Sequence, residues 1–200
     1  MSTPAFIVTY DYRCPFANVM HGHIMTAQRA GANFDVTFAP WSLTQGHGDD
    51  GDLDVWNDPS REDDIAALTA SVSVRDLQPD RFLDAHMALF AARHERGVRL
   101  NTLEEVVGVL REVGVDVDSV LADLSSRRPH EVLAASHHRF EKYEAFGVPT
   151  FVVDDDAVFV RYMHGPTADA QASIDLVRSI VDMIANQPDL NEFKHTRLPA

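Results

Sequence analysis

The chain has 200 residues and a formal net charge of −14, and 45% of its residues are hydrophobic. This composition suits a globular protein with a sizeable core, so we expect one domain or one domain with a large insertion. The negative charge argues against nucleic acids and anionic membranes as partners, because both require basic patches on the protein. No apolar run approaches the length of about 20 residues that a membrane span requires.

The chain contains a single cysteine. One cysteine excludes an intramolecular disulfide and any zinc site built from several cysteines. The first predicted strand begins directly after residues 1–4 with no sign of a signal peptide, so we expect a cytoplasmic protein whose thiol stays reduced. The ten histidines lack the i, i+4 spacing with a carboxylate partner that a metal site would use, and we assign no metal.

The first predicted strand and the first predicted helix flank the cysteine. β-branched and aromatic residues dominate Phe6–Tyr10, which predicts a buried strand. A turn leads to Cys14, and Pro15 suits the first turn of a helix that we expect to run to Arg29. Unpaired N–H groups and the helix dipole at this end favour a negative charge, so we expect a lowered pKa for the thiol and a nucleophilic thiolate. In this setting we favour the thiolate over a cysteine that serves only as a small buried hydrophobe.

A second strand and an acidic loop follow. Residues 34–40 alternate between apolar and polar, which predicts a strand and places Cys14 at the carboxyl end of the first strand of a β-α-β unit. Residues 41–58 are rich in glycine and aspartate but lack the glycine and the final glutamate of a calcium loop, so we expect a solvated acidic loop. Trp41 and Trp56 bracket this loop, and each either packs in the core or lines a pocket over the thiol.

The middle of the chain predicts only helices. Residues 59–146 contain no convincing strand and predict four or five consecutive helices, of which the last extends to Gly147. The expected starts of these helices are Ser60, Pro79, Thr102, Asp118 and Pro129. Thr102 with a glutamate three residues later is the pattern of a capping box.

Strand patterns return near the end of the chain. Residues 150–162 predict a β-hairpin with a turn at three consecutive aspartates. A final helix, capped by Thr167 or Asp169, carries apolar residues on one face and ends before Pro188.

The order of the elements is β-α-β, helical block, β-hairpin, α. We therefore predict an α/β protein with a thioredoxin fold, in which a β-α-β half and a β-β-α half share one four-stranded sheet and an all-helical insertion separates them. We expect a thioredoxin-like domain at residues 1–58 and 147–187, a helical insertion domain at 59–146, and a C-terminal tail at 188–200.

Two motifs resemble the thioredoxin superfamily: Cys-Pro-Phe-Ala at residues 14–17, and Gly-Val-Pro-Thr at residues 147–150. The helical block between them narrows the resemblance to the DsbA-like branch, which includes kappa-class glutathione transferases and 2-hydroxychromene-2-carboxylate isomerases. In that family the proline corresponding to Pro149 is cis and lies beside the active-site sulfur. The residue before it, here Val148, offers backbone groups to a bound thiol or peptide.

The resemblance assigns the chemistry to Cys14 and implies binding roles for Pro15, Phe16, Val148, Pro149, Thr150 and His138. The sequences Ser136-His137-His138 and Phe193-Lys194-His195-Thr196-Arg197 are similar to those of the actinobacterial mycothiol-dependent nitroreductase group. His138 either packs structurally, which we favour, or points toward the thiolate.

One departure from the family pattern concerns Ala17, which stands where the dithiol members have a second cysteine. Without that cysteine the protein cannot form an internal disulfide, but one thiolate can still form a mixed disulfide that a small thiol resolves. The resemblance thus implies a monothiol oxidoreductase that acts with mycothiol or glutathione, neither of them permanently bound. The isomerase and kappa-transferase relatives have serine in place of Cys14 and use it to activate bound glutathione.

Three functions therefore remain open. The first is the monothiol oxidoreductase, the second is a thiol-dependent isomerase or transferase in which Cys14 only orients the cofactor, and the third is a non-catalytic redox sensor or binder. The expected partners are a small thiol and a small, flat apolar substrate, because apolar and aromatic residues occur in the segments expected to cover the site. A homodimer is also expected, because relatives of this branch are often dimers.

Overall fold

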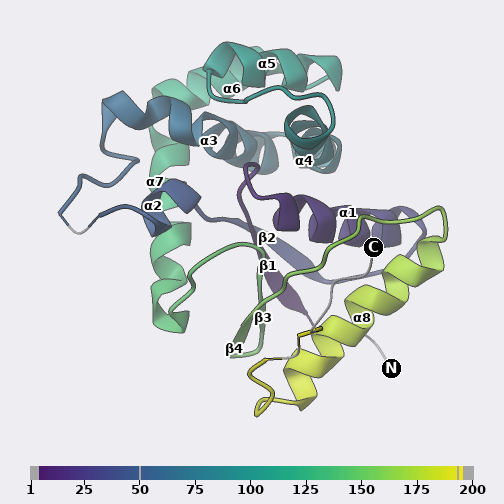
Figure 1. Cartoon of the computed structure of the whole chain (residues 1–200). Coiled ribbons are helices and arrows are strands. Elements are labelled where there is room, and N and C mark those ends of the chain that lie inside the picture. The colour runs from purple at the N-terminus through teal and green to yellow at the C-terminus, as the bar shows by residue number, and fades with distance from the viewer. Residues whose placement is uncertain (1–4, 50, 193, 196–200) are drawn as a thin grey trace.

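The computed structural model describes residues 5–49, 51–192 and 194–195 (Figure 1). The four strands of its single sheet have the order β2-β1-β3-β4 and are β1 Phe6–Tyr10, β2 Val36–Pro40, β3 Thr150–Val153 and β4 Asp156–Phe159. β1 pairs parallel with β2 and antiparallel with β3, and β3 pairs antiparallel with β4. This mixed sheet is the thioredoxin fold that the element order predicts, with β1 at its centre.

The described residues form eight α-helices: α1 Pro15–Arg29, α2 Leu43–Gly46, α3 Glu62–Leu77, α4 Pro79–His94, α5 Leu103–Glu112, α6 Val117–Ser125, α7 Arg128–Arg139 and α8 Ala170–Asn186. Two 3₁₀ helices lie at Pro59–Arg61 and Glu141–Tyr143. The helices α3 to α7 form the insertion between β2 and β3. In Figure 1, α3 to α6 lie at the top and α7 runs down the left side, while α1 lies between α4 and α8. The N-terminus of α1 thus lies where the insertion meets the sheet.

Several helix starts differ from those predicted. The predicted cap Asp118 lies inside α6, because Asp116 has an extended backbone and its side chain accepts from the N–H groups of Asp118 and Ser119. In the same way Asp58 caps the 3₁₀ helix that precedes α3, and Ser60 donates its hydroxyl to the Asp58 carboxylate. The predicted cap at Thr102 is confirmed, since its hydroxyl accepts from the N–H of Glu105.

Other differences concern where elements end. The predicted long helix to Gly147 stops at Arg139, and a 3₁₀ turn follows that ends at Glu144 in the left-handed conformation with φ 51°. The short helix α2 occupies part of the segment predicted to be a loop, and its start is capped by Ser42, whose hydroxyl accepts from the N–H of Gln45. β4 ends at Phe159 and not at Tyr162, and the following segment leaves the sheet.

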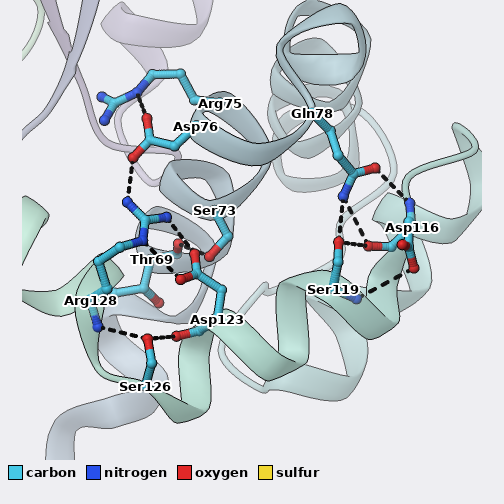
Figure 2. Close-up of polar contacts among 10 residues, drawn as sticks. All are labelled: Thr69, Ser73, Arg75, Asp76, Gln78, Asp116, Ser119, Asp123, Ser126 and Arg128. Carbon is cyan, nitrogen blue, oxygen red and sulfur yellow. Dashed lines mark hydrogen bonds and ion pairs between the residues drawn. The ribbon is translucent and has the colours of Figure 1, made fainter.

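Two groups of hydrogen bonds and ion pairs hold the insertion helices together (Figure 2). Arg128 at the start of α7 forms ion pairs with Asp76 of α3, at 2.6 Å, and with Asp123 of α6. The amide of Gln78 accepts from the N–H of Asp116 at 2.8 Å and donates to the Asp116 carbonyl and the Ser119 hydroxyl, each at 2.9 Å. Because ion pairs that face solvent contribute only about 0–1 kcal/mol, their main effect is to fix the relative positions of these helices.

A chain of buried hydrogen bonds connects the insertion to α1 and β1. The His21 Nε2–H donates to the carbonyl of Thr9 at 3.1 Å, so its Nδ1 must accept from His86 Nε2–H, at 2.8 Å. The His86 Nδ1 then accepts from the hydroxyl of Tyr12, also at 2.8 Å. All four residues are at most 1% exposed. The partners therefore require both imidazoles to be neutral, with one proton each on Nε2.

Burial disfavours a charge on either imidazole. It lowers the pKa of His21 to about 4, and burial together with the nearby His21 holds the pKa of His86 well below its ordinary value. A histidine whose pKa falls on folding stabilises the native state fully above its unfolded pKa of about 6.5. That contribution is lost as the pH falls toward the folded value.

We predict an acid-dependent loss of stability that depends on His21. Between pH 7 and pH 5 this histidine alone should lower the free energy of unfolding by about 2 kcal/mol, because only the unfolded chain takes up its proton. Urea unfolding of wild type and His21→Gln at both pH values would measure the difference, since glutamine can retain the hydrogen bonds but does not titrate. The exposed His138→Gln serves as the control, and an equal pH effect in wild type and His21→Gln would contradict the prediction.

Candidate active site

Cys14 lies at the start of α1, after the turn that follows β1, as predicted. It is the N-cap residue of α1, with Pro15 at the first helical position, and it is 7% exposed. Its N–H donates to the carbonyl of Asp11 at 3.0 Å, and its own carbonyl accepts from Asn18 at 3.1 Å, which begins the helix. The turn between strand and helix therefore fixes the position of the thiol.

The second motif meets the cysteine because β3 pairs with β1. The peptide bond between Val148 and Pro149 is cis, the isomer that the family resemblance implies. Directly after it, the N–H of Thr150 donates to the hydroxyl of Thr9 at 2.7 Å, which holds the start of β3 against β1. The Sγ of Cys14 donates to the carbonyl of Val148 at 2.9 Å. The two motifs recognised in the sequence thus form one site.

The acidity of Cys14 differs from the expectation. Burial raises the pKa of the thiol above its ordinary value, and this outweighs the N–H groups of Ala17 and Phe16, which face the sulfur and lower the pKa. The carboxylate of Asp11 raises the pKa further. The prediction of a thiolate at neutral pH is therefore wrong for the free protein, in which a neutral thiol donates to the Val148 carbonyl.

Asp11 is a site residue that the sequence analysis missed. It is 2% exposed, and its carboxylate accepts from the N–H groups of Arg13 and Leu43, each at 2.9 Å. Burial raises the pKa of this carboxyl, which the Arg13 guanidinium only partly offsets. Asp11 thus ties the turn before Cys14 to the segment after β2. Its place directly after a buried strand was the available signal, but its burial could not be read from the sequence.

The outer side of the site is apolar. Pro15 is exposed and Phe16 is half-buried, and the guanidinium carbon of Arg161 lies 4.5 Å from the centroid of the Phe16 ring. Phe146, just before the second motif, is 66% exposed, and its ring packs against Phe159 with 5.1 Å between the centroids. An aromatic side chain therefore lies in the first motif and another directly before the second.

Comparison with known proteins agrees with this geometry. The family model of the DSBA-like thioredoxin domain matches residues 7–165, which include both motifs and the insertion. The chain belongs to this family. No protein of curated function matches the sequence.

Several solved structures share the fold of this DSBA-like domain. The thiol-disulfide oxidoreductase MdbA from Actinomyces oris has 18% sequence identity and a TM-score of 0.62, with 89% of this chain and 80% of that chain covered. DsbA from Pseudomonas aeruginosa has 19% identity and a TM-score of 0.59, with 94% and 87% covered. A putative protein disulfide isomerase from Nitrosomonas europaea has 15% identity and a TM-score of 0.60, with 88% and 98% covered.

The histidines of α7 lie against the tryptophans in this DSBA-like domain. His137 stacks on Trp41 with centroids 4.6 Å apart, and both tryptophans are buried, so the packing alternative holds for Trp41 and Trp56. The ring of His138 lies 5.1 Å from that of Trp56, and its Nε2 is 3.8 Å from the carboxylate of Glu141. The ring of His138 also lies 6.4 Å from that of His137, and none of the contacts of His138 among the described residues is with the thiol.

The acidic loop of the DSBA-like domain encloses a cavity of about 240 Å³, and Cys14 is not among the residues that line it. It is lined by Thr44, Gln45, Gly48, Asp49, Gly51, Asp52, Leu53, Asp54 and Arg61, most of them polar. This cavity is therefore not the apolar pocket over the thiol that the sequence suggested. Within the tail motif, Phe193, Thr196 and Arg197 lie outside the described residues. None of the described helices is long and apolar enough to cross a membrane.

We predict that Cys14 titrates above the free-cysteine value of about 8.5, because burial and Asp11 both disfavour the thiolate. The rate of alkylation by iodoacetamide against pH would give the midpoint. Asp11→Asn should lower the midpoint, since it removes the nearby charge, whereas Asp175→Asn on the exposed face of α8 should leave it unchanged. A wild-type midpoint at or below 8.5 would show that the helix N-terminus dominates.

Proposed function

We propose that the protein is a monothiol thiol-disulfide oxidoreductase that acts through Cys14 with a low-molecular-weight thiol, mycothiol or glutathione. One observation carries the proposal: the single thiol donates to the carbonyl of Val148 beside a cis proline, in a domain of the DSBA-like family. Ala17 occupies the position of a second cysteine, so oxidised Cys14 must bond to another molecule.

The reaction begins when the neutral thiol of Cys14 loses its proton to solvent and the resulting thiolate attacks one sulfur of a disulfide. The new S–S bond forms as the old one breaks, and the leaving thiolate takes up a proton from solvent. The N–H groups of Phe16 and Ala17 face the sulfur and stabilise the charge of the attacking thiolate. A second thiol molecule then attacks the mixed disulfide, and Cys14 leaves in reduced form.

The acidity of Cys14 favours reduction of substrates over their oxidation. A strongly oxidising site keeps its reduced thiolate stable, because a thiol of low pKa is a good leaving group. Burial and Asp11 have the opposite effect on Cys14, so its mixed disulfide should persist until a small thiol resolves it. This direction requires a supply of reduced small thiol, which supports the expectation of a cytoplasmic protein.

The substrate class follows from the surface beside the sulfur. Phe16 belongs to the first motif and is half-buried, and Phe146 directly precedes the second motif and is 66% exposed. These rings support a small aromatic or apolar substrate, since flat apolar molecules stack on aromatic side chains. The homodimer remains part of the proposal on the resemblance alone.

A thiol-dependent isomerase or transferase is the second candidate. The observation that favours it is the resting state of Cys14, a neutral thiol that donates a hydrogen bond. Such a donor could orient the thiolate of a bound cofactor without forming a covalent bond, the role that serine has in the isomerase and kappa-transferase relatives.

We predict a mixed disulfide at Cys14. Incubation with oxidised glutathione or mycothiol disulfide should add one thiol mass per chain, and the corresponding reduced thiol should remove it, because no second cysteine competes. Intact mass spectrometry and peptide mapping would locate the adduct, with Cys14→Ser as the control. No adduct from either disulfide would contradict the oxidoreductase. Retained thiol-dependent turnover in Cys14→Ser would then favour the isomerase or transferase, and loss of all turnover would favour the sensor or binder.

We also predict that Ala17→Cys forms an internal disulfide and gains insulin-reducing activity. Residue 17 is 0% exposed and lies in the first turn of α1, three residues after Cys14, so a thiol there lies within reach of Sγ. The variant should lose its stable adduct, because the new thiol expels the small one. Arg29→Cys at the other end of α1 is the matched control, since its thiol is too far away. An oxidised Ala17→Cys with two free thiols would contradict the prediction.

A further inference from the structure

The segment after β4 is fixed along α1, close to the candidate site. At its start, the N–H of Val160 donates to the carbonyl of Pro149 at 3.0 Å. Further along, His23 Nε2–H donates to the carbonyl of His164 at 3.0 Å. The ring of Pro166 lies so close to Gly22 that a Cβ there would be 3.2 Å from the proline Cδ. Figure 1 shows this green segment crossing α1 on its way to α8.

Between the attachments at Val160 and His164 lies Arg161, whose guanidinium is stacked 4.5 Å from the centroid of the Phe16 ring. Because Phe16 follows Cys14 by two residues in the first turn of α1, one residue connects the cation to the nucleophile. A stacked guanidinium keeps the donors at its edge free, and its planar fork matches the two oxygens of a carboxylate. The position therefore suits recognition of a group attached to the reacting sulfur.

Arg13, directly before the first motif, and Arg161, stacked on Phe16 of that motif, differ in the use of their hydrogen-bond donors. The guanidinium of Arg13 is occupied by Asp11, Asp64 and the hydroxyl of Thr44. The guanidinium of Arg161 forms no ion pair or hydrogen bond within the part of the chain that the structure describes, and Arg161 is exposed. In a protein of net charge −14, an unpaired cation beside the nucleophile is available to an anion.

We propose that Arg161 is a carboxylate subsite for the disulfide or thiol that reacts with Cys14. This inference rests on the proposed function and deepens it, because it names the charge of the reaction partner. The guanidinium holds the carboxylate while Cys14 attacks the disulfide sulfur, the S–S bond breaks and the departing thiolate takes a proton from solvent. Glutathione carries two carboxylates and mycothiol carries none, so the subsite favours an acidic thiol of the glutathione kind.

The test compares three disulfides of different charge: anionic oxidised glutathione, neutral hydroxyethyl disulfide and cationic cystamine. Mass spectrometry gives the second-order rate constant of adduct formation at Cys14 for each. Arg161→Gln should lower the rate about tenfold with oxidised glutathione, because one charge-assisted hydrogen bond is lost, and leave the neutral disulfide within twofold. Arg161→Glu should also raise the rate with cystamine. Rising salt should weaken the preference of wild type for oxidised glutathione.

Two controls separate charge recognition from structural effects. Arg161→Lys should retain most of the preference for oxidised glutathione, and Arg178→Gln, which removes an exposed cation on α8, should change none of the rates. Equal losses with all three disulfides, or no loss with any, would overturn the subsite while leaving the proposed function intact. If wild type forms no adduct with any of the three, the proposed function itself is contradicted.

Discussion

The hydrogen bond from Cys14 to the carbonyl of Val148 joins two segments 134 residues apart in the chain. It depends on the antiparallel pairing of β1 with β3, because Cys14 follows β1 and Val148 precedes β3. The N–H of Thr150 donates to the hydroxyl of Thr9 and so reinforces the pairing at the end nearest to the thiol. A shift of this register by one residue would turn each side chain of β3 to the other face and separate the two motifs.

Thr9 also connects the site to the helical insertion. Its hydroxyl accepts from β3, while its carbonyl accepts from His21, the first imidazole of the chain that continues through His86 to Tyr12. Since Tyr12 lies two residues before Cys14, α4 supports the turn that carries the thiol. The insertion is therefore part of the scaffold of the site, and movement of α4 would be transmitted to the nucleophile through neutral, fully buried groups.

Sequence patterns predicted the fold, because its signals are local: the strand Phe6–Tyr10, the proline that opens α1 and the hydroxyl cap at Thr102. They also brought the two motifs to one site through the family resemblance. They did not reveal the contact between His21 and His86, which are 65 residues apart, nor the burial of Asp11. The acidity of Cys14 was predicted in the wrong direction for the same reason, since the helix N-terminus is a local feature and desolvation is a tertiary one.

The carbonyl of Val148 can accept a hydrogen bond both when Cys14 is a free thiol and when it is part of a mixed disulfide. In the free protein the carbonyl of Val148 accepts from the neutral thiol of Cys14. Oxidation to a mixed disulfide removes that donor and leaves a buried carbonyl unpaired, at a cost of about 1–3 kcal/mol unless another donor replaces it. The amide N–H of a bound cysteinyl thiol would be such a donor, because it lies a few bonds from the reacting sulfur. If the proposed function holds, we therefore expect the site to discriminate against thiols that lack an amide, by a term that is independent of their charge.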